Sequence, residues 1–149
     1  MENSQDSQTQ ALAYEFQALR ERKDMYEQNL ELLHASLSNL TNTKETVRNL
    51  ENVKEGDEIL IPVGGLVNLK ATIKEPENIL LSVSDVVIEK NIEGSIEFLD
   101  KLINQHQEQI KFLNEQLEEI EIRLQAISRM FRQGSFPQES FPQGSFPQE

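Results

Sequence analysis

Apolar residues recur at alternating intervals of four and three positions through the first part of the chain. From about Ser7 they form a seam, which contains two lysines: Leu12, Phe16, Leu19, Lys23, Tyr26, Leu30, Leu33, Leu37, Leu40, Lys44 and Val47. About five heptads of this spacing are a strong coiled-coil signal. Because no Gly or Pro stands between Met1 and Lys54, the pattern predicts one long helix over residues 1–54.

Between residues 56 and 91 the apolar period shortens to about 2, which is typical of strands. Two alternating runs meet at Gly64-Gly65, and we expect a tight hairpin turn there because glycine reaches positive φ values. Pro62 cannot donate a ladder hydrogen bond, so we expect an edge or a bulge at this position. This part of the block therefore predicts a first β-hairpin.

The same block contains a second pair of short runs, Ile79–Val83 and Val86–Lys90, joined by Ser84-Asp85. The segment Glu75-Pro76-Glu77-Asn78 predicts a turn between the two hairpins, because the proline ring presets φ. We interpret residues 55–93 as a double β-hairpin block.

An isolated hairpin is only marginally stable, and its exposed edges invite pairing with another chain. We therefore expect residues 55–93 to be an assembly module. The residues expected to mediate oligomerisation share the apolar faces of the strands: Ile59, Ile61, Val63, Val67, Leu69, Ala71, Ile73, Ile79, Leu81, Val83, Val86 and Ile88.

A second heptad pattern covers residues 94–133, with an expected helix start near Gly94-Ser95. Its seam carries one polar residue, His106: Ile92, Ile96, Leu99, Ile103, His106, Ile110, Leu113, Leu117, Ile120, Leu124, Ile127 and Phe131. The two helices have similar lengths and one seam each, so the simplest partner for each is the other, folded back antiparallel. The predicted fold class is α+β: a long antiparallel two-helix coiled coil with two β-hairpins at the bend.

Residues 134–149 contain three Ser-Phe-Pro-Gln units. Proline every five residues and little apolar content predict a disordered, solvated tail. The alternative is a peptide arm that touches clients or neighbours through its regularly spaced phenylalanines, Phe136, Phe141 and Phe146.

Charge and composition limit the classes of binding partner and the cellular compartment that we expect. The chain has 14 Lys+Arg against 26 Asp+Glu, a formal net charge of -12, which argues against nucleic acid and anionic membranes. It has no cysteine, which excludes disulfides and thiolate chemistry and fits a reducing compartment. The polar start lacks the features of a secretory signal, and no apolar run approaches the length of a spanning helix. We expect a cytoplasmic protein.

No catalytic constellation is present in the sequence. Its two histidines are His34, in an E-x-x-H spacing with Glu31, and His106, in the second seam. A di-iron bundle site needs a second such motif and further carboxylates, so we expect structural roles for both histidines, no metal and no cofactor. Lys23 and Lys44 could recruit acidic partners, or their stems could pass the seam with the charge in water. We predict that the chain is not an enzyme.

The remaining candidate is an apolar surface where the start of the first helix meets the end of the second. Helix ends have fewer neighbours, so part of this area should stay exposed, and Met and Phe suit contact with varied partners. The expected client-binding residues, which we call the tip cluster, are Leu12, Tyr14, Phe16, Leu19, Leu124, Ile127, Met130 and Phe131. Ordinary packing within the seam is the alternative.

The order helix, two hairpins, helix resembles the α-class subunits of prefoldin. Residues 56–64, Gly-Asp-Glu-Ile-Leu-Ile-Pro-Val-Gly, look like the family's first-strand motif. The run Val87-Ile88-Glu89-Lys90-Asn91, with Ile96-Glu97-Phe98, resembles its entry into the second helix. The Ser84-Asp85 turn departs from the glycine-rich turn that is common in the family.

The resemblance implies that the strand block joins a β-barrel-like platform, in a hexamer of two α-class and four β-class prefoldin subunits. It implies an ATP-independent holdase whose helix tips catch unfolded client proteins and pass them to a chaperonin. The alternative within the family is assembly with copies of itself into a filament, since free strand edges can propagate head to tail.

Overall fold

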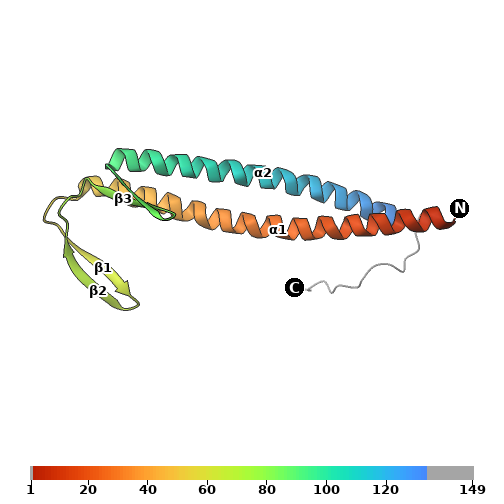
Figure 1. Ribbon diagram of the computed structural model, residues 1–149, viewed down its shortest axis with the longest axis horizontal. Helices are drawn as coiled ribbons and strands as arrows, with labels where there is room; N and C mark the ends of the chain where they lie inside the picture. Colours follow the sequence, from red (N-terminus) through yellow and green to blue (C-terminus); the bar gives the residue numbers. More distant parts are fainter. Residues whose placement is uncertain (1, 134–149) are drawn as a thin grey trace. The chain divides into compact units, whose positions relative to one another are not determined.

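The structure is a computed structural model, and it describes residues 2–133, with side chains from residue 7 onward. Figure 1 shows the elements, which follow the predicted order of helix, two hairpins and helix. They are α1 (Glu2–Asn49), the 3-10 turn η1 (Leu50–Asn52), β1 (Glu58–Gly64), β2 (Val67–Thr72), β3 (Ile79–Val83), β4 (Val86–Lys90) and α2 (Ile92–Arg132). The prediction for the tail, residues 134–149, lies outside the described residues.

The chain divides into two compact units. The first, which we call the helical unit, comprises Met1–Leu32 and Ile110–Glu149. Its segments of α1 and α2 run antiparallel, since Glu15 pairs with Arg123 while Lys23, further along α1, pairs with the earlier Glu121 of α2.

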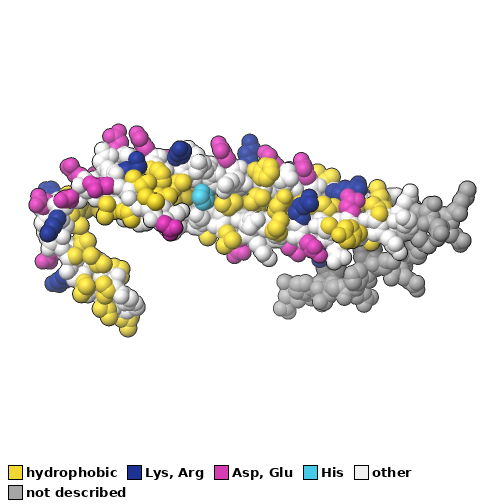
Figure 2. Space-filling model, in the orientation of Figure 1, with side chains coloured by type: hydrophobic (Ala, Val, Ile, Leu, Met, Phe, Trp, Pro, Cys, Tyr) yellow, Lys and Arg dark blue, Asp and Glu magenta, His cyan; other side chains and the backbone are white. Residues whose placement is uncertain are grey.

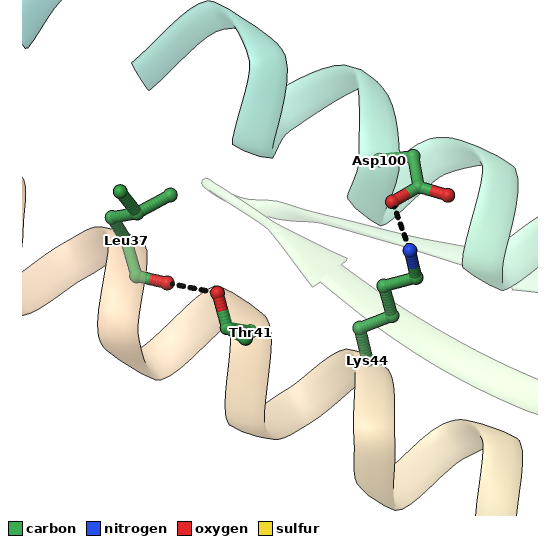
Figure 3. A network of polar contacts seen from close by, with 4 residues as sticks. All are labelled: Leu37, Thr41, Lys44 and Asp100. Atoms are coloured by element: carbon green, nitrogen blue, oxygen red, sulfur yellow. Dashed lines mark hydrogen bonds and ion pairs between the residues drawn. The ribbon is translucent and has the colours of Figure 1, made fainter. Parts of the chain in front are cut away.

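The second unit, Leu33–Gln109, is called the strand unit here because it holds both hairpins. Its helix segments are antiparallel too: Ser36 contacts His106, and Lys44 pairs with Asp100. Figure 3 shows Lys44 reaching from α1 to Asp100 on α2. The predicted antiparallel pairing of the helices is confirmed within each unit.

Helix α2 begins at Ile92, slightly before the expected start near Gly94-Ser95. The reason is the cap: the Asn91 side-chain oxygen accepts a hydrogen bond from the Gly94 N–H at 2.8 Å. A Cβ on Gly94 would lie 2.9 Å from that oxygen, so glycine leaves room for the cap. Gly94 is thus part of the first turn of the helix.

The β1–β2 hairpin is antiparallel, with Ile59 opposite Ala71 and Ile61 opposite Leu69. Its register shifts between Pro62 and Gly64, which confirms the bulge expected at Pro62. The predicted turn at Gly64-Gly65 is wrong by one residue. Gly64 ends β1 with φ 136°, and the turn is Gly65-Leu66, because the bulge uses an extra residue of β1.

The β3–β4 hairpin is regular, with Leu81 opposite Ile88 and Val83 opposite Val86. Its turn is Ser84-Asp85 as predicted, and Ser84 has φ 53°, a conformation that costs energy for a residue with a Cβ. The turn before β3 also forms as predicted, since the Asn78 N–H donates to the Glu75 carbonyl oxygen at 3.3 Å.

Few apolar side chains are buried in the part of the chain whose side chains the structure describes. Val47, Leu81 and Leu99 are buried in the strand unit, and Ile120 and Ile127 in the helical unit. A two-stranded ribbon cannot bury a side chain by itself, and β1 and β2 are almost entirely exposed. The 9% exposure of Leu81 therefore requires cover from outside the β3–β4 ribbon.

Candidate functional site

The β1–β2 hairpin carries the largest group of exposed apolar residues in the strand unit. Leu66, in its turn, is 100% exposed, and Figure 2 shows apolar side chains over the two strands. The expected oligomerisation residues that are exposed here are Ile59, Ile61, Val63, Val67 and Leu69. Ala71 and Ile73 are half-buried.

One face of this hairpin is apolar and the other is mainly polar. Ile59, Ile61, Leu69 and Ala71 share the apolar face, because side chains opposite each other in an antiparallel ladder point to the same side. Leu60 lies on the other face, opposite Lys70, and is an exposed apolar residue that strict alternation did not single out.

The β3–β4 hairpin differs, because part of its expected oligomerisation face is used within the chain. Leu81 is buried there in the single chain, and its expected role in oligomerisation stays a prediction. Ile79, Val83 and Ile88 are half-buried, and Val86 is exposed. The opposite face exposes Leu80 and Val87, which the sequence reasoning missed. The sequence did contain a signal for Leu80 and Val87. They lie in continuous apolar runs, which are typical of strands covered on both faces: Ile79-Leu80-Leu81 and Val86-Val87-Ile88.

Each sheet of the described chain has two strands, β1-β2 and β3-β4, so every strand is an edge strand. Edge strands present unpaired backbone N–H and C=O groups that can pair with another chain. Open edges and an exposed apolar face together make the β1–β2 hairpin a candidate assembly surface.

The structure separates the tip cluster into exposed and packed residues. Tyr14 is 78% exposed and Met130 is 42% exposed. Ile127 is fully buried, so it belongs to the packing between the helices and cannot contact a client while they stay paired. The half-buried members are Leu12, Phe16, Leu19, Leu124 and Phe131.

An ion pair clamps the two helices beside the tip cluster. The Arg123 Nε and Nη2 atoms donate to the two carboxylate oxygens of Glu15 at 2.6 and 2.9 Å. The hydrogen bonds from Arg123 are the main cause that holds the pKa of Glu15 below its usual value. Partial desolvation opposes them, and the charge of Arg123 adds a smaller lowering effect on the pKa. The same contact raises the pKa of Arg123.

The two seam lysines find their acidic partners within the chain. Lys23 Nζ lies 3.0 Å from Glu121 on α2 and 3.5 Å from Glu27 on α1. Its hydrogen bond to Glu121 is the main reason that the pKa of Lys23 is raised. Lys44 pairs with Asp100 in the same way (Figure 3). Both lysines therefore link α1 to α2.

His106 also joins the helices. Its Nδ1 donates to the Leu102 carbonyl oxygen at 2.9 Å, so in the neutral ring Nε2 accepts from the Ser36 hydroxyl at 2.9 Å. His34 is exposed. Among residues 2–133 no group of three or more His, Asp and Glu side chains could hold a metal ion.

A shallow groove of about 380 Å³ lies where η1, the turn before β3 and the start of α2 meet. It is lined by apolar residues, three carboxylates and one amide: Leu50, Glu51, Val53, Pro76, Glu77, Asn91, Ile92 and Glu93. These lining side chains include no nucleophile paired with a base. No helix in the described part of the chain is long and apolar enough to cross a membrane.

Comparison with known proteins gives consistent matches. The family model Prefoldin, described as prefoldin subunit, matches residues 19–135. Prefoldin subunit alpha of Pyrococcus horikoshii is 34% identical over 126 residues, covering 83% of this chain and 85% of the relative. Prefoldin subunit alpha of Methanospirillum hungatei is 26% identical over 114 residues, 76% of each chain.

A solved structure has the same fold. A chain of the cryo-EM structure of filamentous PFD from Methanocaldococcus jannaschii aligns with a TM-score of 0.68, over 76% of this chain and 95% of that one. The two sequences are 16% identical, so the match concerns the fold alone.

Proposed function

This chain belongs to the prefoldin family, and we propose that it is an α-class subunit of an ATP-independent holdase. Membership of this chaperone family supports a chaperone role and assembly with other prefoldin subunits or with itself. In the proposed mechanism the assembled subunits bind unfolded proteins in the cytoplasm and pass them to a chaperonin. The chain itself performs no catalysis.

The observation that carries this proposal is the open apolar face of β1–β2. Exposed contiguous apolar surface in a folded chain marks an interaction site, and Ile59, Ile61 and Leu69 are exposed on one face of a ribbon whose edges are unpaired. We propose that β-class prefoldin subunits cover this face and extend the sheet into a β-barrel-like platform. Residues 55–93 would then act as the assembly block.

Client binding is proposed for the exposed members of the tip cluster. Tyr14 and Met130 offer apolar surface without any opening of the helices, and methionine adapts its shape to varied partners. The ion pair between Glu15 and Arg123 would keep the helices together while a client is bound.

The test is aggregation of a chemically denatured client without ATP, with the chain alone and mixed with a β-class prefoldin subunit. We expect the assembled wild type to suppress light scattering. Tyr14→Gln combined with Met130→Gln should lower this protection several-fold while the assembly, checked by native mass spectrometry, stays intact.

Ile122→Gln is the matched control, since Ile122 is also an exposed apolar residue of α2 but lies outside the tip cluster. It should leave protection unchanged. Equal protection by the wild type and the Tyr14/Met130 variant would overturn the assignment of the client site. No protection by any assembled form would overturn the holdase proposal.

The second candidate function is a self-assembling filament. It is favoured by the fold match to filamentous PFD together with the open strand edges of this chain. Electron microscopy of the purified chain without a partner separates the two. Filaments that lengthen with concentration support self-assembly, and a discrete small oligomer at every concentration contradicts it.

A further inference from the structure

A second apolar stripe runs along α1, outside the seam. Ala11, Ala18, Met25 and Leu32 are spaced by seven residues, or nearly two helical turns, so they share one side of the helix. All four are exposed. None of the four residues belongs to the seam, and the described part of the chain leaves them uncovered.

Helix α2 also has exposed apolar residues, and they lie on the side from which Arg123 projects. Phe112 and Met130 are exposed, and they stand eleven residues before and seven residues after Arg123. Those intervals are close to three and two full turns of about 3.6 residues, so both side chains project from the same side of α2 as Arg123.

The ion pair between Glu15 and Arg123 places the two stripes on one flank. Glu15 is four residues after Ala11 and three before Ala18, so it projects from their side of α1. Because Glu15 accepts a hydrogen bond from Arg123 at 2.6 Å, the apolar residues beside Glu15 on α1 and those beside Arg123 on α2 lie on the same flank of the helix pair. All of them belong to the helical unit, and we call this set the flank strip: Ala11, Ala18, Met25, Leu32, Phe112 and Met130.

We propose that the Ser-Phe-Pro-Gln repeats of residues 135–148 bind along the flank strip of the same chain, so that at Met130 they compete with a client for the same side chain. The repeats follow Met130 after only a few residues, so one end of the strip lies next to the start of the segment. The Phe-Pro pairs provide the apolar contacts, and the proline-rich backbone needs little ordering to extend.

The lengths agree. In an extended polyproline conformation of about 3.1 Å per residue, Phe136 and Phe146 would lie about 31 Å apart. Ala11 and Leu32 are also about 31 Å apart at a rise of about 1.5 Å per residue. Phe136 would then lie near Ala11, Phe141 between Ala18 and Met25, and Phe146 near Leu32.

A tethered occupant fits this surface better than a second copy. Standard interfaces between proteins use roughly 20 to 30 residues a side, whereas the flank strip has few residues and its α1 stripe begins with two alanines. A segment held by a short tether is present at an effective concentration on the order of millimolar, so a weak contact suffices.

The experiment uses the full chain with a photoreactive benzophenone amino acid in place of Phe141. Equal amounts of unlabelled and nitrogen-15-labelled chains are mixed, irradiated, and mapped by mass spectrometry. We expect crosslinks within one chain, centred on residues 18–25 of α1. Combining Met25→Gln with Phe112→Gln should reduce their yield about tenfold, because burial of even one such side chain corresponds to a factor of about ten.

Leu66→Gln is the control, since it removes an equally exposed apolar side chain from the β1–β2 turn and should not change the yield. Far-ultraviolet circular dichroism checks that each variant keeps its helices. Crosslinks between labelled and unlabelled chains would assign the strip to a second copy and overturn the proposal. Crosslinks spread over the chain, or a yield that the Met25/Phe112 variant leaves unchanged, would overturn it too.

Discussion

The β1–β2 and β3–β4 hairpins follow each other in sequence and share the same antiparallel pairing, but only β3–β4 contains a buried apolar residue. Leu81 of β3 is covered within the chain, whereas Ile61 and Leu69 of β1–β2 remain exposed. Hydrophobic burial is the main favourable term in folding. The β3–β4 hairpin is therefore stabilised by its own chain, and we propose that β1–β2 gains the same stabilisation from another chain.

We propose that this difference gives the two similar hairpins separate roles. Substitutions in β3–β4 should change the stability of the single chain, and substitutions on the apolar face of β1–β2 should change its assembly.

The largest effect is expected from Ile61→Glu combined with Leu69→Glu. These residues face each other in the ladder, so the variant puts two carboxylates on the proposed interface. Unpaired buried charges cost several kcal/mol, so association should weaken by on the order of a thousandfold. Native mass spectrometry should show monomers with unchanged helicity.

The matched control adds the same charge to the opposite face, as Asn68→Glu with Thr72→Glu, since both residues are exposed there. It should assemble like the wild type. If both double variants assembled equally well, the apolar face would not be the interface.

The next effect concerns the stability of the single chain. Leu81→Ala should lower the free energy of unfolding by about 2–3 kcal/mol, because a buried leucine is replaced by a cavity. Its neighbour Leu80 is 66% exposed, and Leu80→Ala should cost less than about 1 kcal/mol. Urea unfolding of both, in the monomeric Ile61/Leu69 variant, separates stability from assembly. Equal losses would refute the proposed burial of β3 on its own chain.

A smaller effect is expected where β4 leads into α2. Asn91→Ala removes the hydrogen bond to the Gly94 N–H and should cost about 1 kcal/mol. Asn78→Ala, in the turn before β3, removes an exposed side-chain contact to Glu75 and should cost less than about 0.5 kcal/mol. Thermal unfolding of both variants tests this order, and the cap has no special role if Asn78→Ala costs as much.

The smallest effect is a gain in stability. Ser84 has a positive φ in the β3–β4 turn, so Ser84→Gly should stabilise the chain by about 0.5 kcal/mol through relief of backbone strain. Asp85→Gly is the control, because Asp85 does not have a positive φ and a glycine there only adds flexibility to the unfolded chain. A loss of stability in the Ser84 variant would contradict the strain.

Most of the fold was predictable because it depends on local periodicity. The change from heptads to alternation gave both helices and both hairpins, and Pro62 indicated the bulge. The exact turn was missed because the bulge shifts Gly64 into β1. The start of α2 was placed late because glycine usually ends a helix, and the capping geometry of Asn91 depends on side-chain contacts.

The candidate site was less predictable. The periodicity identifies apolar faces but does not say which of their residues other elements cover, and the structure shows that Leu81 and Ile127 are buried. The same limit explains why the ion-pair partners of Lys23 and Lys44 were not predicted. Their acidic partners, Glu121 and Asp100, stand far along the chain and meet them only when α2 pairs with α1.

Hydrogen exchange measured by mass spectrometry tests the central difference most directly. The wild-type chain is compared as a monomer at low concentration and as the assembly, alone or with a β-class partner. We predict that assembly slows exchange mainly in residues 58–72, while residues 79–90 are protected to a similar degree in both states. Equal gains of protection in both hairpins, or a gain confined to residues 79–90, would contradict the assignment of β1–β2 as the assembly surface.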